Sequence, residues 1–93
     1  MKIEEIMNCI KDICTRHHVR SYLFGSFAKG LAHKTSDIDI AVDCDDENVY
    51  WLIEDEISEI ETLRKIDILY LNQPGLGQNI REDIIKYGKI LSE

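Results

Sequence analysis

Apolar residues recur along the chain at two spacings, every three to four residues in some segments and every second residue in others. The wider spacing is typical of an amphipathic helix, and alternation is typical of a strand with one buried face. The wider spacing predicts three helices, over residues 2–16, 45–63 and 76–87. Alternation and one short apolar, aromatic run predict three strands, over residues 19–24, 37–42 and 65–71.

Glycine and proline positions predict where these elements end. Gly25 closes the first strand, residues 26–30 form a short helical turn, and a loop continues to Ser36. Gly88 stops the third helix, and residues 90–91 add an edge strand. The predicted order is therefore α-β-α-β-α-β-α. It indicates an α/β (α+β) fold class, a small sandwich with helices packed against a mixed sheet. Without repeats or a linker, residues 1–93 are expected to form one domain.

The predicted second helix has a buried stripe formed by apolar residues at helical spacing, namely Val49, Leu52, Ile53, Ile57, Ile60 and Leu63. Trp51 falls off this stripe. Two interpretations stay open for it: an exposed anchor for a partner, or a side chain packed over the helix start.

Composition narrows the function classes. Hydrophobic residues make up 44% of the 93 residues, with one Pro and five Gly, which excludes a disordered tail or a collagen-like repeat. The formal net charge of −7 argues against direct nucleic-acid binding, because phosphate contacts need clustered Lys and Arg. The acidity is local, since residues 35–63 hold 11 of the 18 acidic residues and no Lys or Arg.

Three further features concern location. No apolar run is long enough for a membrane span, so no membrane association is expected. The N-terminus meets acidic residues where the apolar region of a signal peptide would begin. An odd count of three cysteines without a CxxC pair predicts reduced thiols rather than a disulfide framework. A cytoplasmic location is therefore expected.

The chemistry concentrates in Gly25-Ser26 and, after a ten-residue spacer, Asp37-Ile38-Asp39. Gly25 lets the backbone approach a ligand, and Ser26 offers a hydroxyl and an amide to a phosphate. Asp37 and Asp39 stand two apart on a strand, so their carboxylates project side by side and repel each other unless a cation lies between them. Mg²⁺ is the natural cation, because it takes oxygen ligands and shares them with substrate phosphates.

A third acid, Asp67, follows on the next predicted strand. It could complete a site for two metal ions or take a proton from an attacking hydroxyl. Each piece also has an ordinary structural interpretation, because a Gly-Ser after a strand is usually a turn and paired acids are usually a solvated face. Their combination favours function: Ile38, Ile40 and Val42 face a core while the acids face the other way.

These residues resemble the DNA polymerase β-type nucleotidyltransferase superfamily. Gly25-Ser26-Phe27-Ala28-Lys29-Gly30 and Ser36-Asp37-Ile38-Asp39-Ile40-Ala41-Val42 are most similar to its minimal nucleotidyltransferase (MNT, MntA-like) antitoxins, and the resemblance covers nearly the whole chain. It implies a nucleotidyltransferase-like sandwich. It also implies a catalytic, Mg²⁺-binding set of Asp37, Asp39 and Asp67, and a nucleotide-binding set of Gly25, Ser26, Lys29 and Ser36.

The resemblance also implies a reaction and a partner. Such proteins are usually encoded beside a HEPN-domain ribonuclease toxin, which they silence by transferring AMP from ATP to a tyrosine. Members of the family often carry Arg directly after the Gly-Ser, where this chain has Phe27. Lys29, His33 or Lys34 would then supply positive charge for the phosphates.

Two other functions stay open. The chain could mask its toxin by binding alone, without turnover, or it could modify a small molecule such as an aminoglycoside. The complete carboxylate set argues against masking, because unused clustered acids cost stability. The absence of a second, substrate-binding domain argues against a small-molecule acceptor.

Overall fold

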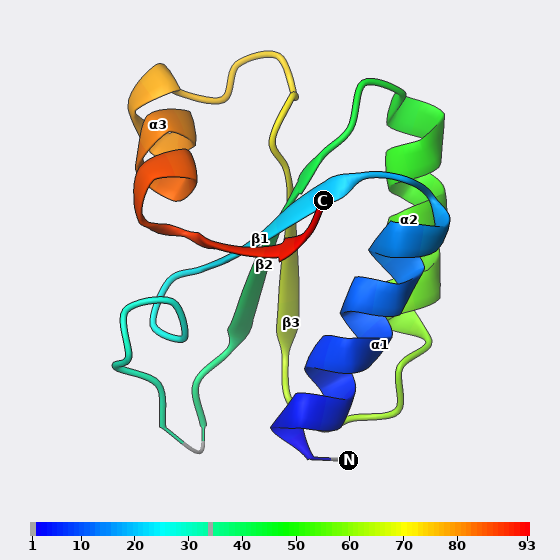
Figure 1. Cartoon of the computed structure of the whole chain (residues 1–93), viewed down its shortest axis with the longest axis vertical. Helices are drawn as coiled ribbons and strands as arrows, with labels where there is room; N and C mark the ends of the chain where they lie inside the picture. Colours follow the sequence, from blue (N-terminus) through cyan, green and yellow to red (C-terminus); the bar gives the residue numbers. More distant parts are fainter. Residues whose placement is uncertain (1, 34) are drawn as a thin grey trace.

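The computed structural model describes residues 2–33 and 35–93 and shows a four-stranded sheet between helices (Figure 1). In chain order its elements are α1 (Ile3–Arg16), β1 (Arg20–Phe24), β2 (Ile38–Asp43), α2 (Glu47–Ser58), β3 (Ile66–Tyr70), α3 (Gln78–Tyr87) and β4 (Lys89–Ser92).

The sheet is mixed, with the strand order β3-β2-β1-β4. The central strands β1 and β2 are antiparallel, and β4 pairs antiparallel with the outer side of β1. β2 and β3 run parallel, because α2 carries the chain back across the sheet between them. This α+β arrangement confirms the fold class expected from the sequence.

The two faces of the sheet are covered differently (Figure 1). α1 and α2 lie on one face, over the main core, to which β2 contributes Ile38, Ile40 and Val42. α3 lies on the other face, over a smaller cluster of Tyr22, Ala41, Leu71 and Ile84. The alternation along β2 therefore sends its aspartates to the face that carries α3.

The second predicted helix is shorter than expected. α2 begins after Asp46, whose side chain accepts a hydrogen bond from the Asn48 amide at 2.9 Å, and it ends at Ser58 rather than at Leu63. Its last turn holds no basic residue, so acidic side chains oppose the helix dipole there. The prediction of a buried side chain is wrong at two positions of the stripe. Leu63 lies beyond the helix and is fully exposed, and Leu52 is 55% exposed.

The segment after Gly25 is a turn rather than a separate helix. Lys29 N donates to Gly25 O at 3.2 Å and Leu31 N donates to Ser26 O at 2.9 Å, but positive φ angles at Gly25 and Gly30 bound these turns. The observed order is consequently α-β-β-α-β-α-β, with the predicted edge strand present as β4. None of the helices described here is long and apolar enough to cross a membrane.

Trp51 on α2 is 51% exposed, and its ring meets that of Tyr50 edge to face, with centroids 5.2 Å apart. Tyr50 is itself buried and stacks on Tyr70 of β3 with centroids 4.6 Å apart. The exposed half of Trp51 thus remains available to a partner, whereas Tyr50 belongs to the core.

Candidate active site

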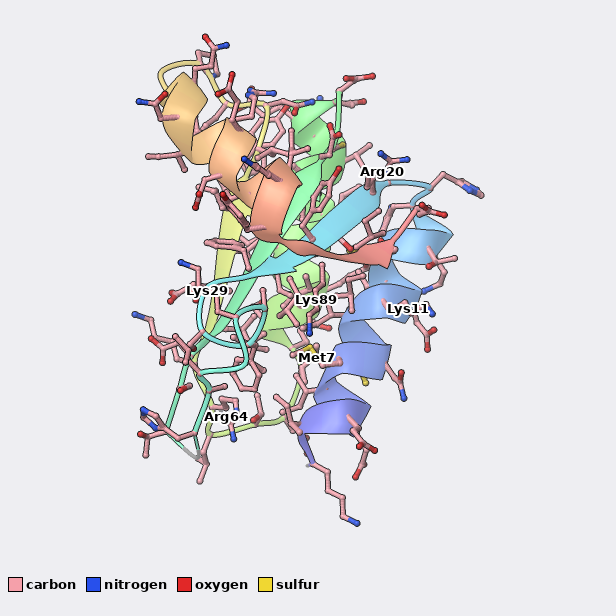
Figure 2. All side chains as sticks on the ribbon, turned by 60° about the vertical axis from the view of Figure 1, so that its left-hand side comes forward. Met7, Lys11, Arg20, Lys29, Arg64 and Lys89 are labelled. Atoms are coloured by element: carbon pink, nitrogen blue, oxygen red, sulfur yellow. The ribbon has the colours of Figure 1, made fainter. Side chains whose placement is uncertain are left out.

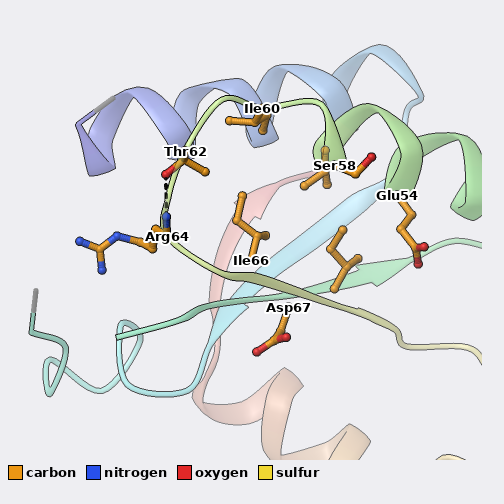
Figure 3. A pocket seen from close by; sticks show the side chains of 9 residues that line it. Glu54, Ser58, Ile60, Thr62, Arg64, Ile66 and Asp67 are labelled. Atoms are coloured by element: carbon orange, nitrogen blue, oxygen red, sulfur yellow. Dashed lines mark hydrogen bonds between the residues drawn. The ribbon is translucent and has the colours of Figure 1, made fainter. Parts of the chain in front are cut away.

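Two of the three candidate aspartates face each other across neighbouring strands. Asp39 of β2 is the register partner of Asp67 of β3. Asp37 precedes β2 and stands two residues before Asp39, so it projects to the same side. Figure 3 shows the Asp67 carboxylate pointing away from Ile60 and Ile66, toward the face that carries α3. The sheet thus brings the three predicted carboxylates to one end of one face.

The carboxylates repel one another in this arrangement. The pKa of Asp39 is raised above its ordinary value of 3.8, first because the side chain is partly buried and then because Asp67 and Asp37 are negatively charged. Lys65 opposes this rise. Its ammonium lies 3.5 Å from Asp67 Oδ1, and both side chains are substantially exposed. The site therefore holds more negative charge than its own lysine offsets.

The donor set suits a hard divalent cation, since it consists of carboxylate oxygens open to solvent. Gly25 leaves room beside it: a Cβ at this position would overlap the Asp39 carboxylate. As the side chains stand in residues 2–33 and 35–93, no three His, Cys, Asp or Glu groups are close enough to enclose an ion. Mg²⁺ does not need three protein ligands, because one or two carboxylates usually hold it together with waters and substrate phosphates.

The Gly25-Ser26 turn lies directly against one of these acids, Asp39. Gly25 adopts a φ of +72°, which favours glycine, at the end of β1. Phe24, just before it, is the register partner of Asp39. The turn therefore stands beside Asp39, where a phosphate bound to its backbone could reach a cation held by the carboxylates.

The other predicted nucleotide-binding residues lie along the loop that follows. Lys29 is exposed and lines a cavity of about 110 Å³ together with Gly25. Ser36 Oγ accepts a hydrogen bond from His33 N at 2.9 Å, so its hydroxyl closes a turn just before Asp37. Lys34 lies outside the described residues.

Arg64 joins the site without having been predicted. Its Nη1 donates to Ser36 O at 2.8 Å and lies 3.5 Å from His33 O, and its guanidinium stands over the Phe27 ring, 5.5 Å from the centroid. Phe27 follows Ser26, Ser36 precedes Asp37, and Arg64 itself stands three residues before Asp67. Arg64 therefore ties together the three segments that carry the site.

Lys29 lies on this loop, whereas Arg64 lies between α2 and β3 and contacts the loop at His33 and Ser36. Figure 2 shows Lys29 nearer to α3 and Arg64 farther from it. Arg64 is the first basic residue after the acidic block of residues 35–63. This position is the one signal in the sequence that sets Arg64 apart. Its contacts span 28 residues or more, so no local pattern predicts them.

A separate cavity of about 390 Å³ lies between α2 and the outer strand β3 (Figure 3). Ile57, Ile60, Ile66 and Ile68 form its apolar wall. Asp67 lines its rim, but the Asp67 carboxylate points to the other side of the sheet. This cavity is therefore distinct from the carboxylate site.

Comparison with known proteins agrees with this geometry. The sequence profile described as "Polymerase beta, Nucleotidyltransferase" matches residues 8–93. The chain belongs to this nucleotidyltransferase family. The match spans the Gly25-Ser26 turn and all three aspartates. Members of the family generally use nucleoside triphosphates and divalent metal ions.

Two solved structures resemble this nucleotidyltransferase chain. One is a chain from the crystal structure of a toxin–antitoxin with AMP-PNP, at 26% identity and a TM-score of 0.66 over 91% of this chain and 71% of that one. The other is described as a minimal nucleotidyltransferase, at 24% identity and a TM-score of 0.59 over 95% of this chain and 94% of that one. No curated protein gives a significant match. The predicted relation to minimal nucleotidyltransferases is confirmed.

Replacing Gly25 tests the close approach of the turn to Asp39. Gly25→Ala should cost about 1–2 kcal/mol for the positive φ, and about 1–3 kcal/mol more because the new methyl displaces the carboxylate. Gly75→Ala is the matched control, since Gly75 has a φ of +88° and open space around it. Urea unfolding of both variants measures the difference. Equal losses of stability would contradict the contact.

Asp39→Asn should stabilise the metal-free protein at neutral pH, because it removes a negative charge that partial burial, and then Asp67 and Asp37, disfavour. We expect a gain of about 0.2–1 kcal/mol, as for other solvent-screened charge pairs. The raised pKa means that the folded wild type binds a proton more readily than the unfolded chain. The gain should therefore shrink as the pH falls through the raised pKa toward 3.8. Urea unfolding from pH 7 to pH 3.5 measures it, and a pH-independent difference would show that the Asp39 charge is not disfavoured in the folded protein.

Arg64→Gln should loosen the loop between the turn and Asp37. Amide exchange at Leu31 and Ser36, whose N–H groups donate within this loop, should quicken about tenfold, while the core of α1 keeps its protection. Arg16→Gln is the matched control, because Arg16 only pairs with Glu56 at 3.7 Å. Hydrogen exchange read by NMR makes the comparison. Unchanged exchange at Ser36 would show that Arg64 does not hold the loop.

Proposed function

We propose that this chain is an Mg²⁺-dependent protein adenylyltransferase that transfers AMP from ATP to a tyrosine of a cognate HEPN ribonuclease toxin and so acts as its antitoxin. The observation that carries the proposal is the pairing of Asp39 with Asp67, with Asp37 two residues away, beside the Gly25-Ser26 turn. A cluster of carboxylates next to a backbone turn that can hold phosphate is the equipment that nucleotidyl transfer needs.

Each candidate residue has a role in the transfer. Asp37, Asp39 and Asp67 would together hold two Mg²⁺ ions. Bound Mg²⁺ would neutralise the negative charge of the phosphates. The Gly25-Ser26 backbone and Lys29 bind the triphosphate, and Ser36 keeps the loop closed ahead of Asp37. The acceptor oxygen forms a bond to the α-phosphorus as the bond to diphosphate breaks. Asp67 of β3 would take the hydroxyl proton.

A protein acceptor is supported by one comparison and one surface. The resembling toxin–antitoxin structure contains AMP-PNP, an ATP analogue. On α2 the exposed Trp51 and Leu52 offer apolar surface to a partner. Residues 1–93 would act as one catalytic domain, in the cytoplasm, with the acceptor hydroxyl brought by the partner.

Labelling tests the transfer directly. We expect the chain, mixed with the protein encoded beside it, Mg²⁺ and ATP labelled at the α-phosphate, to label a tyrosine of that protein. Asp39→Asn should reduce labelling at least a hundredfold, because it removes a carboxylate ligand. Asp12→Asn, the same change at an exposed position of α1, should label like wild type. No label on a folded, bound partner would end the transfer proposal, and full labelling by Asp39→Asn would end the metal-ligand assignment.

A second candidate function is masking of the toxin by binding alone. Phe27 favours masking, because members of the family often carry a phosphate-binding Arg at this position. The Phe27 ring lies under the Arg64 guanidinium. An Asp37→Asn/Asp39→Asn double variant distinguishes the two functions. If it protects cells from the toxin as well as wild type does, masking is sufficient; if protection disappears while binding persists, transfer is required.

A further inference from the structure

Two adjoining cavities lie between the end of β1 and α3. One, of about 400 Å³, is lined by Phe24 and four α3 residues, Asn79, Ile80, Asp83 and Ile84. The other is the cavity of about 110 Å³ beside Gly25 and Lys29. Phe24, Asp83 and Ile84 line both, so the two spaces are neighbours, and together we call them the cleft; its smaller part adjoins the predicted phosphate-binding turn.

The cleft opens on the same face as the carboxylates. Phe24 is the register partner of Asp39, so both side chains project to the face that carries α3. α3 forms the opposite wall, with Asn79, Ile80 and Asp83 within one turn of one another. A ligand with its phosphates at Gly25 and Lys29 would therefore extend directly into the larger cavity.

The lining combines an apolar floor with a few polar groups. Phe24 is half-buried, and Ile80 is 52% exposed, so both offer surface to a flat ring. Asp83 is an acceptor only, and its charge repels a phosphate but accepts hydrogen bonds from hydroxyl groups. Asn79 carries both a donor and an acceptor, the pair that matches the edge of a nucleobase. Asp83 lines both cavities, which places hydroxyls between them, and Asn79 and Ile80 line only the larger one, which places the aromatic ring there.

We propose that this cleft binds the nucleoside half of the triphosphate: the ribose hydroxyls donate to Asp83, and the base lies on Phe24 and Ile80 with its edge toward Asn79. The inference rests on the proposed function and adds to it the residues that select a ribonucleoside. A carboxylate that accepts from ribose hydroxyls is a recurrent device in nucleotide sites. A cavity of this size suits a nucleoside, whereas an extended peptide needs a longer groove.

Binding measurements by calorimetry, with Mg²⁺ present, test this assignment. The four probes are ATP, 2′-deoxy-ATP, 3′-deoxy-ATP and inorganic triphosphate. Wild type should bind ATP about tenfold more tightly than it binds inorganic triphosphate. It should also bind ATP about tenfold more tightly than at least one of the two deoxy analogues. Asp83→Asn should weaken ATP binding about tenfold and erase the preference over that analogue, while its affinity for inorganic triphosphate stays at the wild-type value. Glu82→Gln is the matched control, because Glu82 accepts from Gln78 on the exposed side of α3.

The outcomes separate the cleft from the proposed function. Ile80→Ser should also weaken ATP about tenfold, without effect on inorganic triphosphate. If wild type binds ATP but Asp83→Asn and Ile80→Ser bind it equally well, the cleft is not the nucleoside site and the proposed function stands. If Ile80→Ser weakens binding of the partner protein and not of ATP, the cleft is a protein contact. If wild type binds neither ATP nor inorganic triphosphate, the proposed function and the cleft fail together.

Discussion

The parallel pairing of β2 with β3 is the constraint on which the site depends. Its register sets Asp39 opposite Asp67, and a shift by one residue would turn one of the two carboxylates into the core under α2. The pairing holds against the repulsion between these acids because the same register buries Ile38 and Ile40 on the other face. Apolar burial on one face thus secures a charged arrangement on the other, and a bound cation would relieve a repulsion that the fold already tolerates.

The same division by face explains how far the sequence predicts the structure. Alternation in residues 37–42 and 65–71 correctly indicates both strands and the common side of their acids, because a strand's period reveals its faces. The end of α2 is not predictable in this way. Leu63 continues the helical spacing, but the chain must leave the helix to bring Ile66 beside Ile38, and only the tertiary path decides where it does so. The common face of the carboxylates could therefore be predicted from the sequence, whereas the C-terminal end of α2 could not.

Arg64 and α3 are the parts of the site that could not be predicted from the sequence. The Arg64 guanidinium is useful because it reaches Ser36 and Phe27 together, and neither contact leaves a periodic signal in the sequence. The α3 wall of the cleft has the same character. Asp83 and Asn79 are ordinary polar residues of an amphipathic helix until the fold sets them beside Phe24. Residues that bind through their own local motif can be predicted from sequence, whereas residues that gain a role through packing require the structure.

The acidic block also divides between the two faces. Asp37 and Asp39 belong to the carboxylate site, whereas Glu56 lies on the α1 side, where its oxygens are 2.8 Å from His17 Nε2 and 3.7 Å from Arg16 Nη1. Glu56 therefore has a counter-charge of its own in Arg16 and stands apart from any cation at Asp39. Neutralising the site leaves the acidity of α2 in place, so that face remains negative whether or not nucleotide is bound. A basic partner surface and an anionic nucleotide can thus be accommodated on opposite sides of one small sheet.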